Sequence, residues 1–198
     1  MTGIDGRPQH RYNEPEDAMN SPPAQMYTRY PVSSVLLYNG VTVAHYLLGA
    51  AGIALGYGYW VGYFLGAVYL GFALVQMYVG MPLKVCPNCV YVRLEESLCI
   101  SGLNVVSRRF TSPGDVKDFG NRAKGALCPN NLYLVALAIP IVAIIPALVI
   151  DFSLVVLAIL AAVVALLAFR FFFMFTKVAC VHCRAKNVCP NAKQMKLA

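Results

Sequence analysis

The sequence predicts an all-α integral membrane protein with four transmembrane helices arranged as two hairpins. Hydrophobic residues occupy 59% of the 198 positions and charged residues only 13%, about half the charged fraction of an ordinary soluble domain. A membrane-spanning helix needs about 20 mostly apolar residues. Four stretches meet this requirement, namely Val32–Leu55, Trp60–Gly80, Leu132–Ile150 and Phe152–Phe175.

The four apolar stretches divide the chain into five segments. These are an N-terminal tail (1–31), a first hairpin (32–81), a cysteine-rich loop (82–131), a second hairpin (132–176) and a cysteine-rich tail (177–198). We expect the N-terminal tail to be disordered and to lack a signal peptide, because it is polar and has no apolar core. Within the loop we expect short helices near Tyr91–Leu98 and Asp115–Lys124.

The basic residues predict the side of the membrane on which each segment lies. All but one of the 16 Lys and Arg residues fall in the two tails and the loop, and Arg170 is the exception. Basic loops stay cytoplasmic, so we expect both termini and the loop on the cytoplasmic side of the cell (inner or plasma) membrane. The net charge of +7 then reflects topology and attraction to anionic lipid. No basic helix or aromatic motif indicates a nucleic-acid partner.

All seven cysteines lie in the same segments as the basic residues. Each hairpin is followed by Lys-Val, a Cys-x-x-Cys pair and a third cysteine, giving Cys86, Cys89 and Cys99 in the loop and Cys180, Cys183 and Cys189 in the tail. A Cys-x-x-Cys turn brings both sulfurs to one side, so two pairs can form a four-thiolate site for Zn²⁺ or iron. In a reducing compartment such clusters bind metal more often than they form disulfides.

We therefore predict a metal centre held by these six cysteines, with Cys128 and His182 as further candidate ligands. Six or seven cysteines exceed the needs of one zinc site, which favours an iron–sulfur cluster. Pro follows Cys86, Cys128 and Cys189, as it follows the last cysteine of the bacterial ferredoxin run, although the spacings differ. A single zinc site would use the two Cys-x-x-Cys pairs.

The predicted function is electron transfer, or service as the membrane anchor and relay of a redox complex. A soluble redox partner would meet the basic face, and a quinone would be the partner in the bilayer. One alternative is a zinc-stapled membrane scaffold or assembly factor. Another is a thiol–disulfide oxidoreductase, because a four-helix bundle with Cys-x-x-Cys resembles in architecture the vitamin K epoxide reductase and disulfide-bond-forming types. Those enzymes act on the oxidising side of the membrane. No nucleophile motif is visible, so the sequence does not decide whether the protein is an enzyme.

Polar residues inside the predicted spans are few, and each one raises a functional hypothesis. His45, followed by Tyr46, either has a structural role or contacts a quinone or another cofactor. Gln76 and Arg170 lie within two turns of the cytoplasmic ends of their helices. Arg170 either extends to the lipid headgroups or faces inward, where it would offset the charge of thiolates or a cluster.

The first hairpin is rich in glycine, with Gly52, Gly56, Gly58, Gly62 and Gly66 spaced for close approach of helix backbones. This pattern predicts either packing between helices of one chain or a dimer interface. Besides the lipid bilayer, the partners of this chain could therefore be further copies of itself or the subunits of a larger membrane complex.

Overall fold

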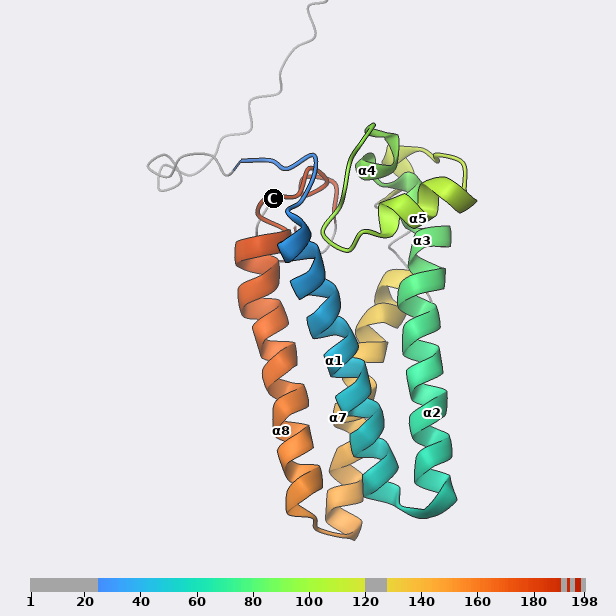
Figure 1. Ribbon diagram of the computed structural model, residues 1–198, viewed down its shortest axis with the longest axis vertical. Coiled ribbons are helices and arrows are strands. Elements are labelled where there is room, and N and C mark those ends of the chain that lie inside the picture. The colour runs from blue at the N-terminus through green and yellow to red at the C-terminus, as the bar shows by residue number, and fades with distance from the viewer. Residues whose placement is uncertain (1–24, 120–127, 190–191, 193–194, 197–198) are drawn as a thin grey trace, which may run out of the picture.

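The computed structural model describes residues 25–119 and 128–189 together with Ala192, Met195 and Lys196 (Figure 1). Among these residues there are helices, turns and two isolated β-bridges, but no strands. Four helices are long and apolar enough to span a membrane, namely Val32–Tyr57, Tyr59–Asn88, Asn131–Ile150 and Leu154–Ala179. The all-α class and the four apolar helices predicted from the sequence are confirmed. The second and fourth helices extend further toward the cysteines than expected.

The long helices stand side by side, and their polar connections gather at one end of the bundle (Figure 1). They are α1 (Val32–Tyr57), α2 (Tyr59–Val75), α7 (Pro129–Ile150) and α8 (Leu154–Phe169). α2 continues through a π-helical segment, Gln76–Gly80, into α3 (Met81–Lys84), and α8 continues into a π-helix, Arg170–Ala179. π-helical turns often occur at functional sites. The second π-helix leads directly to Cys180, and the first precedes Cys86 with only α3 and Val85 between them.

A single residue, Gly58, joins α1 to α2. Its φ of 58° and ψ of −179° form a conformation that is essentially restricted to glycine. No atom lies within 4 Å of the position that a Cβ would occupy. Gly58 is therefore required by the turn, and the expectation that it contributes to helix packing is wrong.

The other four glycines lie inside the bundle. A Cβ on Gly62 would stand 2.3 Å from the carbonyl oxygen of Ala54, and a Cβ on Gly66 would stand 2.7 Å from that of Ala50. The glycines of α1 face the second pair of helices, where Cβ atoms on Gly52 and Gly56 would meet side chains of α7 at 2.4 and 2.8 Å. These glycines allow the helices of one chain to approach closely.

Hydrogen bonds from α1 and α2 reach two backbone carbonyls of α7, one of which Pro140 leaves without its helical partner. Pro140 has no N–H, so the carbonyl of Ala136 loses its helical partner. The hydroxyl of Tyr69 donates to that carbonyl at 3.1 Å. His45 Nε2 donates to the next carbonyl, that of Leu137, at 3.0 Å. α7 therefore continues past Pro140, and the bonds fix its position against α1 and α2.

The described part of the loop between α3 and α7 includes the short helices α4 (Val90–Arg93) and α5 (Leu103–Phe110). α4 is shorter than the helix expected near Tyr91–Leu98, because the chain turns back after Arg93. Arg108 of α5 fixes this turn by donating to the carbonyls of Leu94 and Ser97 at 3.1 and 2.8 Å. α5 was not expected from the sequence.

The second helix expected in the loop, near Asp115–Lys124, is described only at its start. Val116–Asp118 form a 3₁₀ turn capped by the side chain of Asp115, which accepts from the backbone N–H of Lys117. Residues 120–127 lie outside the described residues.

Large apolar side chains cover the outer surface of the long helices. Val149, Ile150, Leu154 and Phe172 are each more than 70% exposed, and Trp60 is 77% exposed beside the α1–α2 turn. An apolar surface of this extent is unfavourable in water. It is the surface expected of helices that contact lipid.

Replacing Gly62 by Ala should destabilise the bundle, because the new Cβ would collide with a backbone oxygen that no rotamer change can move. Overpacking of this kind typically costs about 1–3 kcal/mol. Gly71→Ala is the matched control, since Gly71 lies on the same helix and no atom stands within 4 Å of its Cβ position. The check is the thermal unfolding temperature in detergent; equal temperatures for the two variants would contradict this account of the packing.

Candidate metal centre

The N-terminal segment that precedes α1 joins the loop to the C-terminal tail. The N–H of Tyr27 donates to the carbonyl of His182 at 3.0 Å. Three residues later, the N–H of Tyr30 donates to the carbonyl of Leu98 at 2.9 Å, and the N–H of Leu98 donates to the carbonyl of Thr28 at 3.2 Å. We call residues 27–30 the strap. Its hydrogen bonds fix Leu98 and His182, the residues that precede Cys99 and Cys183.

Tyrosine side chains reinforce the strap. Tyr91 of the loop donates its hydroxyl hydrogen to the carbonyl of Tyr27 at 2.7 Å and accepts from the N–H of Arg184 at 3.3 Å. Tyr30 is 2% exposed, and its hydroxyl donates to the carbonyl of Ala179 at the end of the fourth long helix. Burial raises the pKa of Tyr30 and of Tyr91, so both hydroxyls remain neutral donors. These contacts order residues 25–31 of the segment expected to be disordered; residues 1–24 lie outside the described residues.

The two Cys-x-x-Cys pairs form similar turns at the ends of the second and fourth long helices. In the first pair the N–H of Cys89 donates to the carbonyl of Cys86 at 2.9 Å. In the second pair the N–H of Cys183 donates to the carbonyl of Cys180 at 3.2 Å. Each turn places a pair of thiols at the polar end of the bundle.

A cavity of about 170 Å³ lies between the two turns. Its lining includes seven sulfur-containing side chains, namely Cys86, Cys180, Cys183, Cys189, Met77, Met81 and Met195. Tyr38, Tyr133 and Phe175 line its inner side. The three methionines were not predicted, and no local sequence signal marks them.

Cys89 and Cys99 lie beside this cavity. Cys89 interacts electrostatically with Cys99, Cys183 and Cys189, and Cys183 interacts with Cys99. The structure thus brings all six predicted ligands into one region, although 80 residues of sequence separate Cys99 of the loop group from Cys180 of the tail group.

Burial keeps the thiols of Cys89, Cys180 and Cys183 protonated in the protein without bound metal. It raises the pKa of Cys89 and Cys180 to about 12 and the pKa of Cys183 to about 11, and neighbouring cysteines raise them further. All seven cysteines have free thiols in the structure. The thiols of Cys89, Cys180 and Cys183 are therefore neutral unless a cation takes the place of their protons.

No three Cys, His, Asp or Glu side chains converge closely enough to hold one ion within the described part of the chain. The thiols would have to move closer to one another to bind a metal. The chemistry of the lining nevertheless suits a soft metal, because thiolate and thioether sulfurs select Cu(I), Zn²⁺ and iron–sulfur clusters.

The two further candidate ligands lie apart from the cavity lining. The Sγ of Cys128 accepts from the N–H of Asn131 at 3.3 Å and caps the N-terminus of α7. The His182 ring stacks on Tyr27, with centroids 4.6 Å apart, and its Nδ1 donates to the carbonyl of Gln25 at 2.9 Å. Both side chains have a structural partner in this arrangement.

Arg170 faces the interior of the bundle and does not extend to the headgroups. It is 1% exposed, and its Nη1 donates to the Thr42 hydroxyl at 2.6 Å. Its Cζ lies 4.5 Å from the ring centroid of Tyr38, 5.2 Å from that of Tyr133 and 5.5 Å from that of Phe175. Gln76, the other candidate for charge compensation, is buried at the start of the first π-helical segment.

His45 and Tyr46 are both buried on the inner face of α1. The bond from His45 to the Leu137 carbonyl gives the histidine a structural partner. The ring of Tyr46 packs edge-on against that of Tyr69, with centroids 6.4 Å apart. The predicted contact with a quinone stays a prediction.

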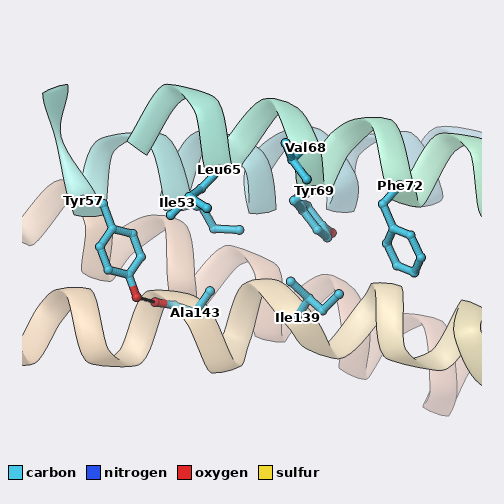
Figure 2. Close-up of a pocket in the computed structure, with 8 residues that line it drawn as sticks. All are labelled: Ile53, Tyr57, Leu65, Val68, Tyr69, Phe72, Ile139 and Ala143. Carbon is cyan, nitrogen blue, oxygen red and sulfur yellow. Dashed lines mark hydrogen bonds between the residues drawn. The ribbon is translucent and has the colours of Figure 1, made fainter. Parts of the chain in front are cut away.

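A second cavity, of about 290 Å³, lies deeper in the bundle between α1, α2 and α7 (Figure 2). Apolar side chains such as Leu65, Phe72 and Ile139 line it. Its two polar groups, the hydroxyls of Tyr57 and Tyr69, donate to carbonyls of α7. This cavity offers apolar contacts and no free polar group of its own.

No protein-family model, curated protein or solved structure matches this chain. The functional assignment therefore depends on the chemistry of the cysteine-lined cavity.

Replacing Tyr30 by Ala should make the cysteines of the metal-free protein more reactive, because the substitution removes a buried ring and the bond to Ala179. At pH 8 a thiol with a pKa of about 11 is ionised in only about one molecule in a thousand, so alkylation of wild-type Cys183 should be slow and should accelerate as the pH rises. Mass spectrometry after N-ethylmaleimide treatment measures the rate. Tyr63→Ala, on an exposed face of α2, is the control, and equal rates for both variants would refute the role of the strap.

Proposed function

We propose that this protein is a multi-pass membrane protein that holds a thiolate-ligated metal centre at one end of its bundle and transfers electrons through it. The observation that carries the proposal is the meeting of two Cys-x-x-Cys turns around one sulfur-lined cavity. A protein in which the cysteines served only as buried thiols would have no need for both turns and both third cysteines in one region.

The cavity end of the bundle faces the cytoplasm in this proposal, and the two long-helix pairs form membrane hairpins. The described parts of the loop and tails, which contain the cysteines and several basic residues, lie at this end (Figure 1), and basic segments are retained on the cytoplasmic side. The cytoplasm is reducing, so the thiols stay available as ligands there.

We favour an iron–sulfur cluster over a single zinc ion as the occupant of the cavity. The volume of about 170 Å³ is several times the roughly 30 Å³ that one water molecule occupies in the liquid. Cys86, Cys180 and Cys183 line the cavity and would be ligands, and Cys189 would be the fourth.

The electron-transfer role follows from the position of this centre. One electron would enter from a reduced soluble protein docked on the basic face, which becomes oxidised. The same electron would leave to a quinone in the bilayer, which becomes reduced. The centre itself returns to its starting state.

Substitution of Cys86 or Cys180 by Ser should each abolish most metal binding, because each removes a cavity-lining thiol from a different turn. Cys128→Ser is the matched control and should retain the metal, since the sulfur of Cys128 caps α7 instead of lining the cavity. The measurement is the metal-to-protein ratio of anaerobically purified protein. Full occupancy in Cys86→Ser or Cys180→Ser would exclude a site shared by the two turns.

The visible spectrum of the same preparation distinguishes the electron carrier from a zinc-stapled scaffold. A thiolate-bound iron–sulfur cluster should give a broad band near ~400 nm that bleaches on reduction. A colourless protein with stoichiometric zinc would support the scaffold and refute the electron-transfer role.

A further inference from the structure

The buried side-chain polar atoms that lack a hydrogen-bond partner, within the described ranges, fall in one place inside the bundle. They are Nε and Nη2 of Arg170 and the hydroxyl oxygens of Tyr46 and Tyr133. Each of these groups carries a hydrogen that it can donate. The tyrosine hydroxyls can also accept a hydrogen bond, but the cluster contains no anionic acceptor among the described residues of the four helices.

The guanidinium of Arg170 is also without a countercharge in the membrane region. The four apolar helices contain no Asp or Glu. The Thr42 hydroxyl and three aromatic rings are neutral partners, and cation–π contacts offset only part of the cost of removing a cation from water. A buried lone cation of this kind calls for an anion close by.

The aromatic rings that hold Arg170 connect it to the cysteine-lined cavity. Tyr38, Tyr133 and Phe175, the three rings nearest its Cζ, are the rings that line the inner side of that cavity. The unpaired hydroxyl of Tyr133 belongs to this wall. The guanidinium thus lies directly behind the cavity, on the side opposite the polar end of the bundle.

We propose that the cavity holds a centre of net negative charge and that Arg170 is its buried countercharge. The inference rests on the proposed metal centre and specifies its charge. Several thiolates outweigh the positive charge of Zn²⁺, and an iron–sulfur cluster with thiolate ligands is likewise anionic. The cysteines then bind as thiolates, and Arg170 stabilises them across the aromatic wall.

Replacing Arg170 should affect the stability of the metal-free protein and its affinity for metal in opposite directions. Arg170→Met removes the charge while keeping an apolar side chain of considerable length. Without bound metal, the variant should be at least as stable to heat as the wild type, because an uncompensated buried charge has been removed. With metal, the variant should bind roughly tenfold or more weakly, because the thiolates lose their countercharge. If Arg170 had only a structural role, the metal-free Arg170→Met variant would be less stable than the wild type, and its metal affinity would be unchanged.

The test uses the full chain in detergent with Zn²⁺ as the probe and a chelator as competitor. Arg170→Lys keeps the charge and should retain most of the affinity. Lys177→Met removes an exposed charge from the same π-helix and should change the affinity by less than about threefold, because solvent screens exposed charges. Thermal unfolding of each metal-free protein completes the comparison.

Two results would overturn the inference, and they are distinguishable from each other. A wild-type protein that holds no metal overturns the proposed function together with the inference. A wild-type protein that binds metal, with unchanged affinity in Arg170→Met, overturns the inference alone.

Discussion

The hydrogen bonds of residues 27–30 are the interaction on which the candidate site depends. They connect the backbone at Leu98 in the loop to the backbone at His182 in the tail. An even number of long helices brings the loop and the tails to one end of the bundle, but this alone fixes neither their distance nor their register. The strap supplies both, and it encloses the thiols in an environment where burial raises their pKa.

A second constraint arises inside the bundle, where charge is costly. Arg170 occupies the fourth long helix without any carboxylate among the apolar helices. Its aromatic partners also form the inner wall of the cavity. The wall therefore has a cation on one side and sulfur ligands on the other. The same aromatic rings therefore pack the helices around Arg170 and separate its charge from the cysteines of the cavity.

The sequence predicted the parts of this structure that depend on local composition. Apolar length located the four long helices, and Cys-x-x-Cys spacing located both turns, because each signal is contained in a short window. The strap was missed, since the bond between Tyr27 and His182 joins positions far apart in a segment that looks merely polar. The aromatic surroundings of Arg170 were missed for the same reason. Gly58 was misassigned because its spacing matches helix packing while its backbone serves a turn.

The most direct test of the central claim is X-ray absorption at the edge of the metal bound to the full chain in its membrane. A centre built from the two cysteine turns predicts a first shell of sulfur atoms only, with distances of about 2.3 Å if the metal is zinc. A first shell that contains oxygen or nitrogen ligands, or a chain that carries no metal, would contradict the account.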